Sequence, residues 1–563
     1  MGPPAGQVRW VLPAFLLVTA LCRVPDVWRP VDATTWNSWR EVDVAAIARN
    51  FYREGMDLFR PRIDWRGEGP GFVESELPLY PWTVAQAYRW FGYREELARV
   101  LSLGLALVSS VFFFLLARAL LSPAGLAGAL AFWAANPLGV RMATSVQPEP
   151  LMAMALLGAV YYFWRWLSGG SSAAYFLSLG FTVLAVLAKI PALYVGLLFA
   201  AMVLDRFGLR GLRRPDVWAF AGVTVAVSLA WYLHARHLYL AYGNSLGASN
   251  EAYRLISPRG LARAARWTIP GNLRNELNGV WTLPGAMLGL AGLASARREP
   301  AGRMAWFWLL ALAAFYLVAG RTTGQQWALY YHVASVPAAA LAVGLGTAAV
   351  GGLVAGCGAG RRAEAATLAA SAAAAGLGAI AGVRAGRFTG AAAGALALAL
   401  GGVFFATLRR IAAAPGAEHA KRARCAWAAA GCLLVGATLA AEVRRTWNEA
   451  HPRDFEEQYG CARAFAARVE PAALIVASGG APTTEGAQAL DAPYYFFWMD
   501  RKGFSLARHS TDAVEAFRRR GARYLVVERE FLERDPAFEG AVRARYPLLA
   551  ECRGNLLLGL PGP

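Results

Sequence analysis

Residues 100–117 read VLSLGLALVSSVFFFLLA, a run of apolar and small residues without a single charged side chain. A helix needs about 20 mostly apolar residues to cross a lipid bilayer, so this run predicts a transmembrane helix over 99–120. The whole chain has the same character, because 57% of its 563 residues are hydrophobic and only 17% are charged. Soluble proteins usually carry about 25% charged residues. The composition therefore predicts an integral membrane protein.

Further apolar segments of this kind predict about thirteen transmembrane helices in all, and hence an all-α polytopic membrane domain. The first segment follows Arg9 and lacks a small-residue cleavage site, so it is interpreted as an uncleaved span rather than a signal peptide. The segments are 10–22, 99–120, 123–140, 149–167, 174–189, 190–204, 217–236, 279–295, 303–319, 327–349, 364–382, 390–408 and 425–442.

Arginine-rich short loops set the expected orientation of these spans. Cytoplasmic loops of membrane proteins carry an excess of Lys and Arg. With a cytoplasmic N-terminus, the most basic loops all fall inside, while 23–98 and the C-terminal region fall outside. The net charge of +19 is then a topology signal, and no nucleic-acid partner is expected.

One apolar segment, Leu79–Phe91 (LYPWTVAQAYRWF), does not fit as a span. It is short, it includes Gln86 and Arg89, and crossing the membrane would invert every later loop. We therefore predict an amphipathic helix at the membrane surface. Trp82, Tyr88 and Trp90 suit the headgroup layer.

The predicted domain boundary separates a transmembrane domain, 1–444, from a small external α/β domain, 445–563. Ala473–Ala477 and Tyr524–Val527 are typical of short buried strands, with a helix over Thr511–Arg520 before the second strand. This order favours a parallel sheet. Cys461 and Cys552 both fall in this domain, either as a disulfide or as two buried thiols.

The first external loop, 23–98, holds the residues best suited to chemistry. Asp43 starts a helical pattern of apolar residues, with Glu41 beside it. Transfer of a sugar to a hydroxyl or amine requires a carboxylate that takes the acceptor proton, and cations or a metal that hold the departing phosphate. Asp43 could instead be an ordinary acid stabilised by a helix N-terminus. Arg60, Arg62 and Arg66 are candidates for phosphate contact, or else surface cations.

Several motifs in order along the chain resemble the C-type glycosyltransferase superfamily, in particular the bacterial branch related to protein O-mannosyltransferases and aminoarabinose transferases. The matching residues are Trp39 to Asp43, Ala46 to Asn50, Glu76, Pro78, Leu79, Tyr80 and Gln147 to Glu149. The resemblance covers about residues 10–240. It implies many spans, two juxtamembrane helices in the first external loop, a catalytic acid early in that loop (Asp43, or else Glu41) and an acid in the second external loop (Glu149).

The sequence departs from this family at Glu76, which lies where aminoarabinose transferases have a lysine before Pro-Pro-Leu. Phosphate contact must then come from an arginine, with Arg62, Arg66 and Arg141 as candidates. Glu74 or Glu76 could bind a divalent cation or a cationic sugar group. Lys189, at a junction of two spans, is a further phosphate-binding candidate, because charges within membranes are usually functional.

These observations predict a glycosyltransferase that moves a sugar from a polyprenyl-phosphate donor to a glycan, lipid or protein acceptor. The expected location is the bacterial cytoplasmic membrane, with the active site and C-terminal domain on the periplasmic side. A divalent cation is possible, but the metal requirement stays open. The alternatives are a transporter or flippase of lipid-linked sugars and a non-catalytic assembly partner.

Overall fold

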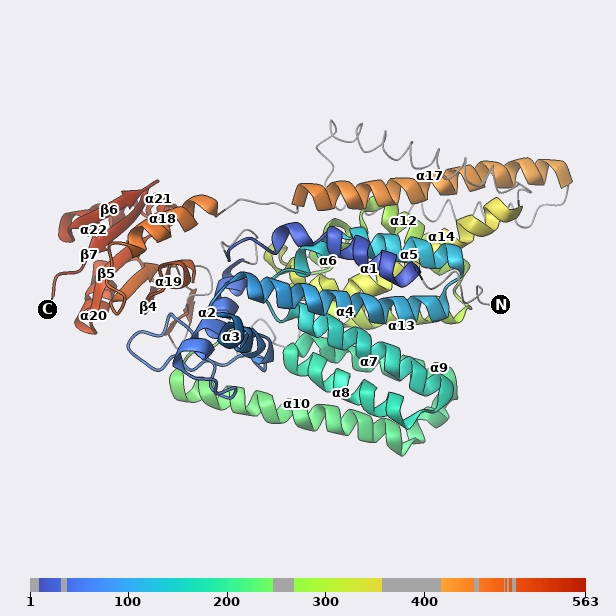
Figure 1. Ribbon diagram of the computed structural model, residues 1–563, viewed down its shortest axis with the longest axis horizontal. Coiled ribbons are helices and arrows are strands. Elements are labelled where there is room, and N and C mark those ends of the chain that lie inside the picture. Colours follow the sequence, from blue (N-terminus) through green and yellow to red (C-terminus); the bar gives the residue numbers. More distant parts are fainter. Residues whose placement is uncertain are drawn as a thin grey trace.

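The computed structural model describes residues 10–31, 38–246, 268–356, 417–449, 455–479, 481–483, 486–488 and 493–562. Figure 1 shows a long helical bundle with the α/β part of the chain at one end. The α-helices of the bundle are α1 (Val11–Leu21), α4 (Glu96–Leu120), α5 (Pro123–Ala135), α6 (Pro137–Met142), α7 (Glu149–Gly169), α8 (Ser172–Ala188), α9 (Val195–Phe207), α10 (Pro215–Tyr242), α12 (Leu283–Ser295), α13 (Pro300–Thr323), α14 (Val336–Gly356) and α17 (Ala417–Glu449).

Short helices of other types join these elements. The 3₁₀ helices are η1 (Val24–Asp26), η2 (Ile190–Tyr194), η3 (Gly208–Arg213) and η6 (Gln326–Ser335), and η5 (Glu276–Trp281) is a π-helix.

Six helices in the described part of the chain are long and apolar enough to cross a membrane, or seven if the helix over Thr268–Trp281, which ends in η5, and α12, bent by 94°, form one broken span. Helices α1, α5 and α8 are apolar but shorter. The protein is thus an integral membrane protein, whereas the count of thirteen spans stays a prediction. The predicted spans 364–382 and 390–408 lie outside the described residues.

The span predicted over 123–140 is two helices, α5 and α6. Asn136 between them is extended, with ψ 122°, and its side chain accepts a hydrogen bond from the amide of Gly139 at 2.9 Å. Pro137 has no amide hydrogen to continue the earlier helix and suits the first position of a new one. The Asn-Pro pair therefore ends α5 and starts α6.

Small residues bring helices of the bundle into close contact, as expected for packing in lipid. A Cβ added to Gly292 on α12 would lie 2.2 Å from the backbone nitrogen of Gly346 on α14. The two backbones therefore touch, and a side chain at this position would force α12 and α14 apart.

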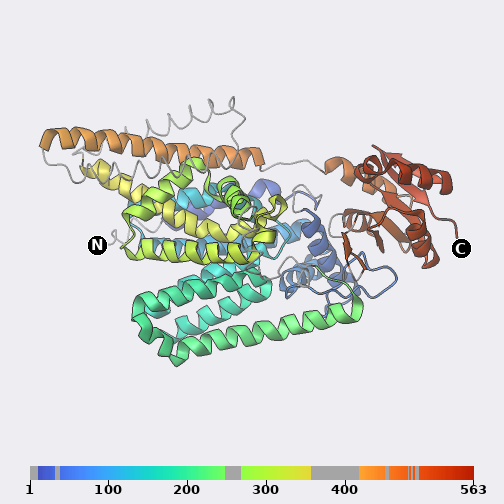
Figure 2. The same ribbon diagram turned by 180° about the vertical axis from the view of Figure 1, so that it is seen from behind.

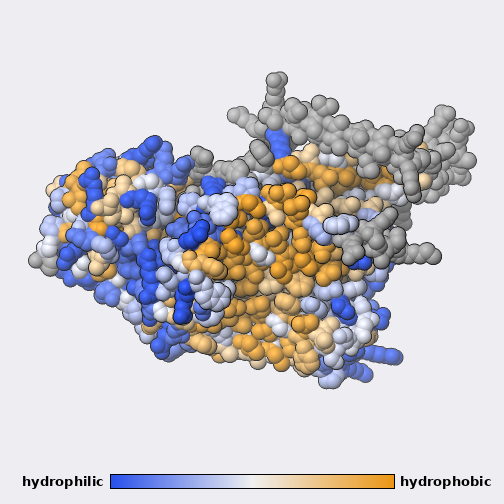
Figure 3. Space-filling view, viewed as in Figure 1, coloured by the Kyte–Doolittle hydropathy of each residue, from blue (hydrophilic) through white to orange (hydrophobic). Residues whose placement is uncertain are grey.

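Apolar side chains cover a broad band of the bundle, and polar side chains gather over the α/β part at its end (Figure 3). Such a band is typical of a surface that faces lipid.

Two helices of the first loop, α2 (Ser38–Glu54) and α3 (Leu79–Phe91), lie at the end of the bundle nearest the α/β part (Figures 1 and 2). Helix α3 has the predicted bounds, and Trp90 is exposed, but Tyr88 is buried against Tyr52 and Tyr93. The prediction that Tyr88 faces the headgroup layer is therefore wrong, because α3 packs on α2 as well as on the bundle.

The start of α2 also differs from the prediction. Asp43 does not begin the helix, because α2 starts at Ser38 and Glu41 is the acid in its first turn. The influence of the helix dipole is strongest in the first turn. An ordinary dipole-stabilised role therefore fits Asp43 poorly, and its environment must be explained by tertiary contacts.

The α/β part follows α17 and contains a five-stranded sheet in the order β4-β1-β5-β7-β6. Strand β1 is parallel to β5, as the sequence predicts, and also to β4, whereas β7 is antiparallel to β5 and β6. The elements are α18 (Glu456–Ala466), β1 (Leu474–Ser478), β2 (Ala481–Thr483), β3 (Gly486–Gln488), α19 (Tyr494–Met499), β4 (Lys502–Leu506), α20 (Thr511–Arg519), β5 (Ala522–Val527), α21 (Arg529–Arg534), α22 (Pro536–Arg545), β6 (Leu548–Cys552) and β7 (Asn555–Gly559).

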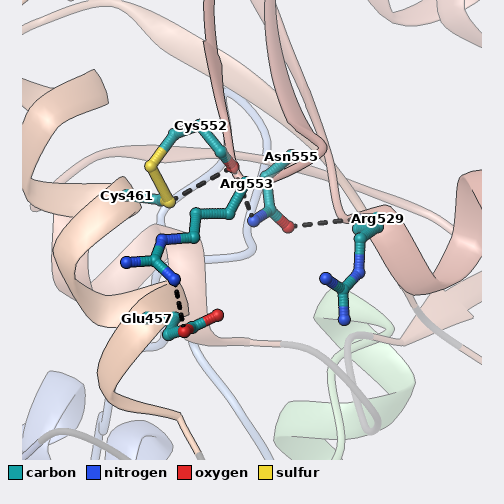
Figure 4. Close-up of a disulfide and its surroundings, with 6 residues drawn as sticks. All are labelled: Glu457, Cys461, Arg529, Cys552, Arg553 and Asn555. Atoms are coloured by element: carbon teal, nitrogen blue, oxygen red, sulfur yellow. Dashed lines mark hydrogen bonds and ion pairs between the residues drawn. A yellow bond between two sulfur atoms is a disulfide. The ribbon is translucent and has the colours of Figure 1, made fainter.

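A disulfide joins Cys461 on α18 to Cys552 at the end of β6, with the two Cα atoms 5.5 Å apart (Figure 4). Next to it, the Asn555 side chain donates to the carbonyl of Cys552 at 3.0 Å and accepts from the amide of Arg529 at 3.0 Å. Of the two alternatives left open by the sequence, the structure has the disulfide. It fastens the first helix of the α/β part to the edge strand of its sheet.

Removal of this disulfide, by Cys461→Ala with Cys552→Ala, is expected to destabilise the α/β part by about 2–5 kcal/mol, because the bridge closes a long loop in the unfolded chain. Limited proteolysis over a temperature series measures the effect. Cys425→Ser, at a free cysteine on α17, is the matched control. An unchanged cleavage midpoint in the double variant would show that the bridge contributes nothing to stability.

Candidate active site

Asp43 on α2 is buried, with 2% of its surface exposed. Its Oδ1 accepts a hydrogen bond from the Trp65 indole at 2.9 Å, and its buried Oδ2 has no hydrogen-bond partner among the described residues. Burial raises the pKa of Asp43 from its usual 3.8 to about 7, although the Trp65 hydrogen bond and the charge of Arg40 oppose the rise. A carboxylate of this kind is suited to proton transfer near neutral pH.

Glu41, on the same helix, has a different environment. Its Oε1 accepts from the amide of Val146 at 3.1 Å, and its Oε2 lies 3.6 Å from Nη2 of Arg99. Arg99 also donates to the carbonyl of Thr144 at 3.0 Å. Glu41 and Arg99 together hold the loop between α6 and α7, which leads to Glu149. The contacts of Glu41 are those of a residue that positions its neighbours.

Arg40 is one helical turn before Asp43; its buried guanidinium forms an ion pair with the partly buried Glu76. It also donates to the carbonyl of Leu246 at 3.2 Å. Burial favours protonation of Glu76, but the charges of Arg40 and Lys189 outweigh it and keep the pKa of Glu76 below its usual value. Glu76 therefore stays ionised between two cations.

Lys189, at the end of α8, forms a buried ion pair with Glu149 at the start of α7. Both side chains are at most 2% exposed. The Lys189 ammonium also lies 4.7 Å from the ring centre of Tyr330 and 5.2 Å from that of Tyr331, which adds cation–π attraction. Leu77, next to Glu76, donates its amide to the carbonyl of Leu187 at 3.0 Å, which brings the first loop to the end of α8.

Glu74 is part of the frame of this cluster. Its Oε2 accepts from the Ser245 hydroxyl at 2.7 Å, and its backbone pairs with Asn244 and Leu246. These bonds fix the first loop to the segment after α10, which supplies the carbonyl that Arg40 contacts.

The arginines predicted for phosphate contact lie elsewhere. Arg62 and Arg66 both bind Glu54, at 3.3 Å and 2.8 Å, and Arg60 is exposed beside Asp57. Arg141 lies at the end of α6, half-buried. The structure thus brings Asp43, Glu76, Glu149 and Lys189 together with Arg40, and gives Arg62 and Arg66 a carboxylate partner of their own.

Comparison with known proteins connects this geometry to a superfamily. The family model described as dolichyl-phosphate-mannose-protein mannosyltransferase matches residues 75–233. The crystal structure of ArnT from Cupriavidus metallidurans bound to undecaprenyl phosphate is similar over 99% of this chain and 98% of its own, with a TM-score of 0.57 and 14% identity. The protein thus resembles the C-type glycosyltransferases, in fold along most of its length and in sequence over residues 75–233.

A second structure supports the same fold. The apo oligosaccharyltransferase of Archaeoglobus fulgidus is similar over 93% of this chain and 70% of its own, with a TM-score of 0.50 and 14% identity. No curated protein sequence matches the chain. The resemblance inferred from the sequence motifs is therefore supported by both comparisons, and the helical fold with a small C-terminal sheet is confirmed.

The family match includes Glu76, Glu149 and Lys189 but begins after Asp43. Two site residues were missed by sequence reasoning, namely Arg40 and Trp65. Arg40 could have been found from its position three residues before Asp43, because residues three apart share a helix face. Trp65 reaches Asp43 from a loop, so no local pattern indicates it.

A metal site gains no support from the described residues. None of them form a group of three His, Cys, Asp or Glu side chains that could hold a metal ion. His332 instead lies beside Glu276, with Nδ1 and Oε1 2.7 Å apart. The divalent cation considered for Glu74 or Glu76 thus stays a hypothesis, and these two acids have protein partners.

Proposed function

We propose that this enzyme transfers a sugar from a polyprenyl-phosphate-linked donor to an acceptor on the external face of the membrane, with Asp43 as general base. The observation that carries the proposal is the environment of Asp43, which is buried, held at one oxygen by Trp65 and without a partner at the other. Its pKa of about 7 suits a base that must accept a proton at neutral pH.

In the proposed reaction, the acceptor oxygen or nitrogen attacks the anomeric carbon of the donor sugar. The bond between this carbon and the phosphate oxygen breaks, and polyprenyl phosphate leaves with the electron pair. Oδ2 of Asp43 takes the acceptor proton as the new bond forms. A single displacement of this kind inverts the anomeric configuration.

Arg40 and Lys189 are the cations proposed to hold the donor phosphate. Each is buried beside Asp43 or Glu76 and is now paired with a carboxylate. Fixed cations in a water-poor site stabilise negative charge on a leaving group far better than they would in water. The structure of ArnT with undecaprenyl phosphate supports a donor of this lipid class.

The disulfide supports an external site. Disulfides form in oxidising compartments and are rare in the cytosol. The α/β part that contains Cys461 and Cys552 lies against α2, on which Asp43 is found (Figure 1). A periplasmic location in a bacterial cytoplasmic membrane, as the arginine-rich loops predict, therefore belongs to the proposal.

The direct test is transfer by purified protein from a panel of labelled polyprenyl-phosphate sugars, with membranes that lack this protein as the source of acceptor. The proposal expects one donor to lose its sugar and to yield polyprenyl phosphate. If the whole panel stays intact while simple vesicle assays show movement of donor across the bilayer, transport is the function instead.

The rate of transfer should depend on pH through Asp43. Because a general base acts only when deprotonated, kcat/KM is expected to rise through about pH 7 and to level off above it. Trp65→Phe removes a hydrogen bond that stabilises the carboxylate, so it should move the rise to higher pH. Steady-state rates across a pH series measure both. A profile that is flat from pH 5 to 9 would remove the pKa argument for Asp43.

A further inference from the structure

Contacts between the first loop and the α/β part converge on one buried acid, Asp64. Lys502, the first residue of β4, forms an ion pair with Asp64 and donates to the side-chain oxygen of Asn50 at 2.5 Å. The backbones pair as well, because Gly503 donates to the carbonyl of Asp64 at 3.2 Å and Gly67 donates to the carbonyl of Gly503 at 2.6 Å. The start of β4 therefore holds segment 64–67 through both side-chain and backbone contacts.

Arg49 on α2 binds the same acid from the other side. One nitrogen is 2.5 Å from Asp64, and another lies 2.9 Å from the carbonyl of Phe497 and 3.0 Å from Asp500. Its guanidinium also stacks over the Phe497 ring at 4.6 Å. Arg49 and Asp64 are both buried. Because their partners Phe497, Asp500 and Lys502 belong to the α/β part, their positions depend on this part remaining in place.

Asp64 is directly followed by Trp65, whose indole donates to Asp43. A continuous path of contacts thus runs from Lys502 through Asp64 and Trp65 to Asp43. Asp43 and Arg49, which binds Asp64, are both on α2, so the path is tied to this helix at Asp43 and at Asp64.

We propose that Lys502 of the α/β part is a positioning residue of the active site, which holds segment 64–67 so that Trp65 binds and orients the carboxylate of Asp43. The inference rests on the proposed function of Asp43. It gives the α/β part a role in the reaction itself.

The charges that act on Asp43 support this role for Lys502. The charged groups that act on Asp43 are Arg40, which favours its ionised form, and Asp64, which disfavours it. Loss of Lys502 leaves Asp64 with less positive charge nearby and frees the segment that carries Trp65. Both changes favour the protonated form of Asp43.

The test compares Lys502→Met with Arg520→Gln in the full-length enzyme. Arg520 belongs to the same interface, where it pairs with Glu68, but about half of each side chain is exposed. We expect Lys502→Met to lower kcat about tenfold to a hundredfold with little change in donor KM, and to move the pH profile toward higher pH. Arg520→Gln should leave both unchanged, and Lys502→Arg should restore most of the rate.

Trp65→Phe provides a second measurement that does not rely on Lys502 alone. If both act through one path, the double variant Trp65→Phe with Lys502→Met should be little slower than the slower single variant. Additive losses, or a fall in kcat without any shift of the pH profile, would overturn the inference. Such results leave the proposed function intact, because that function is tested separately by the donor panel and by Asp43→Asn.

Discussion

Replacing Asp43 by asparagine is expected to slow sugar transfer by about a hundredfold to ten-thousandfold, the usual contribution of a general base. The amide keeps an oxygen that can accept the Trp65 hydrogen bond, so the geometry of α2 is preserved. It cannot take a proton from the acceptor. Transfer from the preferred donor, measured with purified variant and wild type, gives the result.

Glu41→Gln is the matched control for this prediction, because Glu41 lies on the same helix and is equally buried. Its remaining oxygen can still accept from Val146, so we expect no more than a several-fold loss. The opposite ranking of the two variants would assign the base to Glu41, which the sequence alone left open.

A loss of folding stability should not be the reason why Asp43→Asn is inactive. With a pKa raised to about 7, the folded carboxyl keeps a proton that the unfolded chain loses near pH 4. The free energy of unfolding of the wild type therefore falls between about pH 4 and 7 on account of this group. The asparagine variant lacks this loss and should unfold at or above the wild-type temperature at pH 8.

The second large effect is expected at the buried pair of Lys189 and Glu149. Lys189→Met leaves Glu149 as a buried unpaired charge, which should reduce the free energy of unfolding by about 3–5 kcal/mol. A double variant, Lys189→Met with Glu149→Met, removes both charges. Replacement of a whole buried pair by apolar residues is often close to neutral, so it should recover most of the stability.

Measurement of the sugar-transfer rate separates the structural from the functional role of this pair. If Lys189 holds the donor phosphate, the double variant should be stable yet remain slow, with a raised donor KM. Thermal unfolding in detergent and steady-state kinetics on the same samples measure both properties. Wild-type kinetics in the stabilised double variant would limit Lys189 to a structural role.

Local patterns were enough to predict much of the fold. Helix α3 was predicted with its observed bounds, because its length and its polar residues exclude a span. The strands around residues 475 and 525 were predicted from short apolar runs. The break at Asn136 was missed, since hydropathy continues through it although Pro137 starts a new helix.

The site was predicted only in part, because the partners of a charged residue depend on the fold. Asp43, Glu149 and Lys189 were chosen by chemistry and position, and they lie together. Arg62 and Arg66 were chosen on the same grounds but bind Glu54, an acid from the end of α2 that no local rule connects to them. Lys502 lies far along the chain from Asp64, so only the structure indicates their contact.

The most direct test of glycosyl transfer with Asp43 as base uses protein in vesicles and a donor labelled separately on its sugar and its polyprenyl phosphate. Wild-type protein is predicted to pass the sugar label to acceptor and leave the lipid label as polyprenyl phosphate, and Asp43→Asn is predicted to do neither. Movement of both labels across the bilayer still joined, or equal transfer by the Asp43→Asn variant, would contradict the account.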